Sequence, residues 1–182
     1  VITLSTKNVR TVFENAITYS YSDGDQWYEW SPDGKWFLMH YADSHLFRSN
    51  VALVDASGNG KFTNLTQSGY DDSTPRWAMG GKAMIWFSDK QGMRSHGSWG
   101  STSDVYGMFF TQDAFDEFNL SKEEYELQKE AKDKDKGDDK KDDDKDEGDK
   151  LEPITIDLTN IEDRQKRLTI HSSSLSSAIM TI

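Results

Sequence analysis

One stretch of aromatic residues, interrupted by a single turn signal, constrains the fold of this chain more than any other feature. It covers residues 27–39 and reads WYEWSPDGKWFLM, with the turn residues SPDG at its centre. Pro32 fixes φ at about −65° in the second position of a turn, and Gly34 accepts a positive φ in the fourth. Aromatic and aliphatic residues on both sides favour a half-buried, pleated surface. The stretch therefore predicts a β-hairpin.

The same pattern returns later in the chain. Trp77 lies 47 positions after Trp30, Gly80-Gly81-Lys82 takes the place of the turn, and residues 83–87 follow as a second strand. Further short apolar segments follow each hairpin, at residues 51–55 and 61–66 in the first unit and at 104–110 in the second. Short turns join them, so each unit is predicted to be a four-stranded antiparallel meander without crossover helices.

A four-stranded unit that recurs every 40 to 50 residues or so is typical of a β-propeller. We therefore predict an all-β fold made of propeller blades, about two complete blades with partial ones at the ends. A plain antiparallel meander or sandwich is the alternative. The expected boundaries are 1–25 for the end of a preceding blade, 26–66 for a blade, 67–118 with 151–169 for an interrupted blade, 119–150 for an insertion and 170–182 for the start of another blade. Within the interrupted blade, residues 154–158 alternate between apolar and polar and are predicted to form a strand.

The insertion at residues 119–150 differs in composition from the rest of the chain. Ser121 and Glu124 form a capping box, which predicts the start of a short helix. The run 129–150 consists almost entirely of Asp, Glu and Lys and has no large apolar residue to bury, so we expect a disordered surface loop. Its alternating Asp residues resemble a calcium loop, but Asp144 stands where such a loop closes with Glu.

Composition excludes several classes of function. A net charge of −11 argues against a nucleic-acid partner, because phosphate binding needs a basic face. The chain has no Cys, which excludes disulfides and thiolate metal sites. No apolar run reaches about 18 residues, so no membrane span is predicted. None of these features fixes the compartment, and cytoplasmic and exported or periplasmic locations both stay open.

The sequence predicts no catalytic residue, no cofactor and no metal site. The nearest approach to a Gly-x-Ser-x-Gly nucleophile elbow is residues 97–101, GSWGS, which has the wrong spacing. The four His residues lack the spacing of metal ligands. The loops between the second and third strands of both units nevertheless carry His, Arg and Trp and should share one rim. We predict a peptide-binding rim there, with hydrogen bonding between blades as the structural alternative; its residues are His45, Arg48, Arg94, His96 and Trp99.

The repeats resemble those of known propellers. Residues 30–35, WSPDGK, and the Leu-Thr pairs at 65–66 and 168–169 are similar to the blade repeat of TolB-like propellers. The run 88–101, the segments DVY at 104–106 and FF at 109–110, and the charged insertion with its return through 156–169 resemble the propeller of tricorn-like serine peptidases.

The second resemblance implies a function. In tricorn-like peptidases the propeller performs no bond chemistry and controls the access of unfolded peptides to a Ser-nucleophile core with a PDZ-like module. It implies that this chain is a non-catalytic segment acting in substrate access or assembly. The implied partners are peptides or unfolded polypeptide, the remaining blades and the catalytic region of a parent peptidase, and a further copy in a homo-oligomer. Two alternatives stay open: a TolB-like or WD-type binding propeller without enzymatic activity, and the propeller of a prolyl-oligopeptidase-type enzyme.

Overall fold

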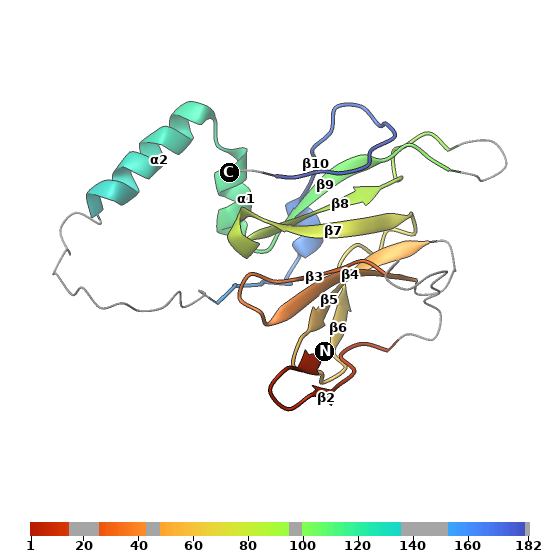
Figure 1. Cartoon of the computed structure of the whole chain (residues 1–182). Helices are drawn as coiled ribbons and strands as arrows, with labels where there is room; N and C mark the ends of the chain where they lie inside the picture. Colours follow the sequence, from red (N-terminus) through yellow and green to blue (C-terminus); the bar gives the residue numbers. More distant parts are fainter. Residues whose placement is uncertain (15–25, 43–47, 95–99, 136–152, 181–182) are drawn as a thin grey trace.

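Two four-stranded antiparallel sheets form the framework of the structure, which confirms the predicted all-β class (Figure 1). The computed structural model describes residues 1–14, 26–42, 48–94, 100–135 and 153–180. The first sheet has the order β3 (Tyr28–Trp30), β4 (Trp36–Ala42), β5 (Ser49–Asp55), β6 (Phe62–Asn64). The second has the order β7 (Asp72–Ala78), β8 (Ala83–Ser88), β9 (Asp104–Phe109), β10 (Gln165–Arg167).

The two sheets have the same register. Trp30 pairs with Phe37 in the first sheet, and Trp77 pairs with Met84 in the second. The correspondence extends across the other strands. Between the second and third strands, Phe37↔Val54 in the first sheet matches Met84↔Met108 in the second. Between the third and fourth strands, Leu53↔Thr63 matches Gly107↔Lys166. A fixed register matters because a shift by one residue would move every side chain to the opposite face. The sheets are therefore two instances of one repeat, and the fourth strand of the second instance is supplied from beyond the insertion.

Each sheet closes with a Leu-Thr pair that has the same bonds. The Oγ1 atom of Thr66 accepts a hydrogen bond from the backbone N–H of Val51 at 3.1 Å, and Thr169 accepts one from Val105 at 3.2 Å. The Leu N–H of each pair donates to the carbonyl of the same Val at 2.8 Å. The repeated dipeptide thus ties the end of the fourth strand to the third strand.

The SPDG turn has the predicted conformation. Gly34 has φ of 68° and Gly81, at the corresponding position, has φ of 95°. Ser31 Oγ accepts from the N–H of Trp36 at 2.9 Å and donates to Asp33 Oδ1 at 2.6 Å. The first bond satisfies a backbone N–H that the tight turn would otherwise leave without a partner, and the second holds the Ser31 and Asp33 side chains together.

Three apolar layers alternate with the two sheets. The layer between the sheets contains residues of both, namely Leu38, Val51, Leu53, Leu65, Met84, Trp86, Tyr106, Met108, Phe110 and Ile161. On the far side of the first sheet, Phe37, Tyr41, Ala52, Val54 and Ala56 pack with Val1, Val12 and Phe13. On the far side of the second, Ala83, Ile85, Val105 and Phe109 pack with the first helix and with Leu175, Ala178 and Met180. Both faces of each sheet are therefore apolar, as in a stack of repeats.

The N-terminal and C-terminal segments lie on these far sides. A short hairpin of β1 (Ile2–Thr3) and β2 (Asn8–Val9) lies beside the first sheet (Figure 1). Residues 174–180 form no strand, although Ser103 and Ser173 make an isolated bridge.

The insertion begins earlier than predicted. Helix α1 (Gln112–Asn119) directly follows the second sheet, capped by Thr111, whose Oγ1 accepts from Ala114 N at 3.2 Å. Helix α2 (Lys122–Asp135) starts at the predicted capping box, in which Ser121 N donates to Glu124 Oε2 at 2.8 Å. The first residues of the predicted disordered loop, 129–135, belong to this helix, and the rest of that loop lies outside the described residues.

The prediction of a strand at 154–158 is wrong. This segment is extended but outside the sheet, because β10 already pairs with the edge of β9. Ile154 N donates to Asp33 Oδ2 at 3.0 Å, and Asp157 N donates to the carbonyl of Phe110 at 2.9 Å. A 3₁₀-helix, η4 (Ile161–Arg164), then leads into β10. Residues 153–164, here called the returning segment, thus contact the turn of the first sheet and the end of the second.

Candidate functional site

The predicted rim is the end of the sheets where the β4–β5 and β8–β9 connections meet the linker from β6 to β7. Two of its five predicted residues, Arg48 and Arg94, are placed by the structure, and Arg48 is exposed. The other three, His45, His96 and Trp99, lie outside the described residues. The GSWGS stretch also falls mostly there.

Arg94 is held over the rim by two contacts. Its Nη2 atom lies 3.1 Å from Asp89 Oδ1, and its guanidinium carbon lies 5.3 Å from the centre of the Tyr70 ring. The Arg94 side chain is still 53% exposed, whereas that of Asp89 is 11% exposed. These two contacts restrain the guanidinium, and its exposure leaves donors available to solvent, an arrangement suited to binding carbonyl or carboxylate oxygens.

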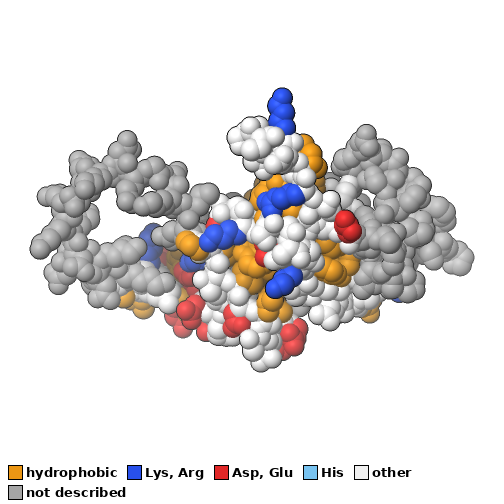
Figure 2. Space-filling model, turned by 90° about the horizontal axis from the view of Figure 1, so that it is seen from below, with side chains coloured by type: hydrophobic (Ala, Val, Ile, Leu, Met, Phe, Trp, Pro, Cys, Tyr) orange, Lys and Arg blue, Asp and Glu red, His pale blue; other side chains and the backbone are white. Residues whose placement is uncertain are grey.

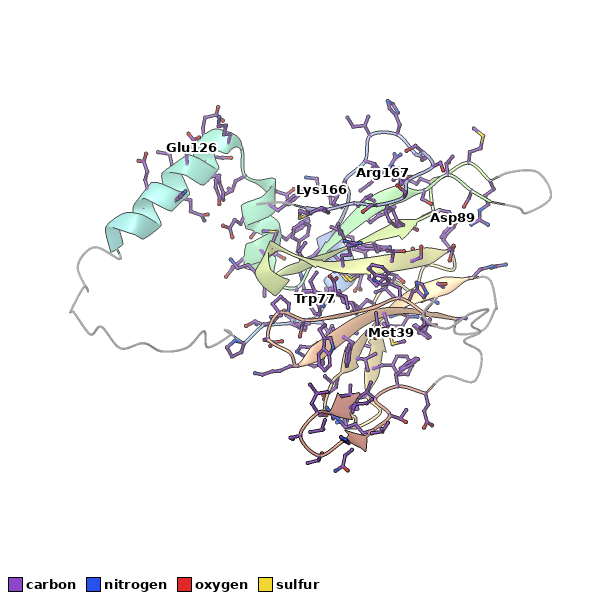
Figure 3. The ribbon with its side chains drawn as sticks, viewed as in Figure 1. Met39, Trp77, Asp89, Glu126, Lys166 and Arg167 are labelled. Atoms are coloured by element: carbon purple, nitrogen blue, oxygen red, sulfur yellow. The ribbon has the colours of Figure 1, made fainter. Side chains whose placement is uncertain are left out.

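A chain of hydrogen bonds joins the two sheets below Arg94. Ser49 N, at the start of β5, donates to Asp71 Oδ1 at 3.2 Å, and Asp71 N donates to Asp89 Oδ1 at 3.0 Å. Asp89 follows β8 directly and lies at the rim end of the second sheet (Figure 3). The rim therefore contains the hydrogen bonding between repeats that was the structural alternative, together with exposed guanidinium donors.

The carboxyl of Asp71 has a pKa above its ordinary value. Burial raises the pKa of the Asp71 carboxyl, and the neighbouring carboxylates of Asp89 and Asp72 raise it further, against the lowering effect of the Ser49 N–H. A carboxyl with a raised pKa in the folded state contributes stability below the unfolded pKa, and this contribution is lost as the pH rises through the folded pKa. At neutral pH the charged Asp71 is thus a destabilising element of the rim.

We predict that Asp71→Asn stabilises the protein at pH 7. The amide keeps an oxygen for the Ser49 N–H and removes the charge, so the free energy of unfolding should rise by about 0.5–1 kcal/mol, a value reduced by the partial exposure of the site. The gain should shrink as the pH falls through the raised folded pKa of Asp71 and should be absent below the unfolded pKa of about 3.9. Urea denaturation at several pH values measures it, and a variant less stable than the parent at pH 7 would show that the carboxylate is favourable.

Asp104, a second carboxylate at the rim end of the second sheet, was not recognised from the sequence as a functional or structural residue. Asp104 is fully buried, and its oxygens accept hydrogen bonds of 2.7 Å from each of Arg167, Thr169 and Ser172. Burial alone would raise the pKa of Asp104, but the bonds from Thr169, Ser172 and Arg167 outweigh it and hold the pKa below its usual value. Asp104 therefore stabilises the fold above the unfolded pKa, and this stabilisation is lost as the pH falls through the folded pKa.

The role of Asp104 is to anchor the segment that follows β10, and Asp104 and Arg167 form an ion pair at the strand ends. Asn50 occupies the corresponding position in the first sheet, since Tyr41↔Asn50 matches Ser88↔Asp104. In the sequence, the only indication of this hydrogen-bond network was that Thr169 repeats Thr66 at the end of the fourth strand.

A small polar hollow of about 310 Å³ lies under the linker between β6 and β7. Asp72 lies at its edge and is 1% exposed; its Oδ1 accepts from the indole N–H of Trp86 at 3.1 Å. The Tyr106 hydroxyl is buried without a hydrogen-bond partner, and burial, followed by the charge of Asp104, raises the pKa of Tyr106. Within the described ranges, no three His, Asp or Glu side chains are grouped to hold a metal ion.

Comparison with family models, with curated proteins and with solved structures found no match for the chain. In the part of the chain that the structure describes, no helix is both long enough and apolar enough to cross a membrane.

Proposed function

We propose that the two sheets are consecutive blades of a β-propeller that belongs to a tricorn-like serine peptidase. In this proposal the segment performs no bond chemistry and controls the access of unfolded peptides to the catalytic region, or the assembly of the peptidase. One observation carries the proposal: the sheets share a register and stack through apolar faces that continue on both far sides. A sandwich needs only one such inner layer.

The positions of β3 and β7, the first strands of the two sheets, support the proposal that these strands line a channel for peptides. β3 and β7 lie next to each other, and the indole of Trp27 donates to the Pro75 carbonyl at 2.7 Å while the Arg76 guanidinium lies 5.0 Å from the Trp27 ring centre. The edge of β7 has a register shift between Ser73 and Arg76 and a proline inside it. Bulges and prolines block strand addition at an edge. Such an edge lets an extended peptide pass without capturing it in the sheet.

The rim supplies the contacts for that peptide. The exposed donors of Arg94, and those of Arg48 on the neighbouring loop, suit peptide carbonyls and carboxylates. Because the chain as a whole has a net charge of −11, acidic polypeptides should bind less well than neutral or basic ones.

We expect the double variant Arg48→Ala/Arg94→Ala to bind unfolded polypeptide about tenfold more weakly, the usual effect of truncating an interfacial Arg. Fluorescence anisotropy with labelled, reduced and carbamidomethylated ribonuclease A, an unfolded polypeptide that is not acidic, measures it. The control is Lys7→Ala/Lys61→Ala, which removes the same charge away from the rim. Equal affinity in both double variants would contradict the rim assignment. Hydrolysis of the polypeptide by the purified chain, blocked by a serine-directed inhibitor, would contradict the non-catalytic role.

The full reading frame separates the alternatives. A downstream Ser-nucleophile core with a PDZ-like module supports the tricorn-like peptidase, whereas a stop codon after the last blade supports a TolB-like or WD-type binding propeller. A downstream α/β-hydrolase domain with Gly-x-Ser-x-Gly would support a prolyl-oligopeptidase-type enzyme.

A further inference from the structure

An apolar hollow of about 800 Å³ opens on the far side of the first sheet. Its floor is formed by Tyr28, Trp30, Phe37 and Met39 of β3 and β4, and Ile2 of β1 lies at its wall. Tyr28 is 62% exposed and Trp30 is 43% exposed, which is unusual for aromatic residues on a sheet face. Seen from the side of the N-terminal hairpin, hydrophobic side chains are visible between Lys and Arg side chains (Figure 2).

The same positions are covered on the second sheet. By the shared register, Trp30 corresponds to Trp77 and Phe37 to Met84. Two positions away along the same strands, Tyr28 corresponds to Pro75, which lies at the register shift of β7, and Met39 corresponds to Trp86. Pro75 and Met84 are less than 2% exposed, and Trp86 is 4% exposed. Figure 3 shows Met39 and Trp77 on the two sheets. The part of this face around Tyr28 and Trp30, which is exposed in the first repeat, is therefore an interface in the second.

The element that covers the second sheet at these positions is the β3–β4 hairpin. Leu38 of this hairpin shares the layer between the sheets with Met84, Trp86 and Trp77. Glu29 Oε2 accepts from the backbone N–H of Trp77 at 2.9 Å, and the Glu29 carbonyl accepts from the Trp77 indole at 3.3 Å. The interface thus needs an aliphatic residue on the second strand of the hairpin and a carboxylate on its first strand.

The N-terminal hairpin occupies only part of the corresponding place beside the first sheet. Phe13, which follows it, lies 5.7 Å from Tyr41 and 5.1 Å from Phe62 between ring centres. The strand β1 pairs with β2 on one edge, and within the described residues no strand pairs with its other edge, next to the hollow. Among the residues that the structure describes, two strands thus lie beside the first sheet, whereas the second sheet is faced by the four strands of the first.

We propose that the hollow is a docking site for a β-hairpin of the β3–β4 type. The hairpin pairs with the free edge of β1, places an aliphatic side chain against Trp30 and accepts the hydrogen bonds of Trp30 with a carboxylate residue on its first strand. Strand addition at an edge combined with an apolar floor is an established mode of polypeptide recognition. The inference rests on the stacked-repeat part of the proposed function and is independent of the rim.

The experiment supplies such a hairpin from the chain itself. A second copy of residues 26–48 is placed ahead of Val1, so that the hairpin and its natural connection to a third strand precede β1. Because the chain has no Cys, Tyr28→Cys in the original copy gives a single reactive thiol in the hollow. We expect the extension to slow the labelling of this thiol about tenfold or more, since labelling then requires local opening.

The control carries Leu38→Asp in the extension alone, which removes the aliphatic contact and should restore fast labelling. Equal labelling rates with and without the extension would overturn the proposal. Slow labelling without the extension, together with a dimer in sedimentation, would also overturn it, because a second copy would then be the occupant. Protection of the introduced thiol without binding of unfolded polypeptide would leave this inference standing and would contradict only the proposed function.

Discussion

Arg164→Ala should destabilise the protein by about 3–5 kcal/mol, more than any other single change considered. Arg164 is 5% exposed at the end of η4, just before β10. Its Nε atom donates to the carbonyl of Phe109 at 3.1 Å, its Nη1 atom donates to the carbonyl of Thr159 at 2.9 Å, and its Nη2 atom donates to the carbonyl of Asp157. Truncation would leave carbonyls of β9 and of the returning segment without donors in a buried place.

The measurement is urea denaturation followed by tryptophan fluorescence. Lys166→Ala removes a neighbouring but exposed cation and should change the free energy of unfolding by less than about 1 kcal/mol. Arg164→Lys should recover little of the loss, because an ammonium group cannot reproduce three divergent planar donors. A loss below about 1 kcal/mol for Arg164→Ala would mean that the returning segment is held by its apolar contacts alone.

Gly81→Ala should cost about 2–4 kcal/mol, because it adds backbone strain to a steric clash. Gly81 has φ of 95°, where a side chain is strained, and a Cβ atom there would lie 2.7 Å from Ile154 Cγ1 and in contact with Ile154 Cδ1. Ile154 is the residue whose N–H bonds to Asp33, so the clash would push the returning segment away from the first sheet.

Gly80→Ala is the matched control. Gly80 also has a positive φ, 63°, but a Cβ atom there meets nothing within 4 Å, so only the conformational cost of about 1 kcal/mol should appear. The double variant Gly81→Ala/Ile154→Ala should be more stable than the sum of its single effects, because the second change removes the clash. Equal costs at Gly80 and Gly81 in thermal denaturation would show that Ile154 is not packed on the turn.

The elements of the first repeat could be predicted because their signals are local. The SPDG turn places Gly34 where a positive φ is needed, and apolar residues on both sides fix the strand type. The fourth strand of the second repeat was found through the Leu-Thr pair at 168–169, although it pairs with β9 from across the insertion. Helix α1 was missed because its eight residues, QDAFDEFN, follow a strand directly and carry one weak cap, Thr111.

The strand predicted at 154–158 was wrong for a non-local reason. Its alternation of apolar and polar residues is that of a strand, yet the edge of β9 that it would need is occupied by β10. The network around Asp104 depends likewise on residues more than 60 positions away, so no local pattern indicates it. Of the rim, the sequence indicated Arg48 and Arg94, but it did not indicate the ion pair of Arg94 with Asp89 or the hydrogen bond from Ser49 of the first sheet to Asp71, which forms only when the two sheets stack.

The second sheet is the same repeat as the first, interrupted by the insertion and completed by residues 165–167. Proton NMR can detect this completion, because residues facing each other in a non-hydrogen-bonded antiparallel pair bring their α-protons close together. We expect strong α-proton contacts between Tyr106 and Arg167 that match those between Ala52 and Asn64. If the Ala52–Asn64 contact is present and the Tyr106–Arg167 contact is absent, β9 is an edge strand and the second sheet is not a complete repeat.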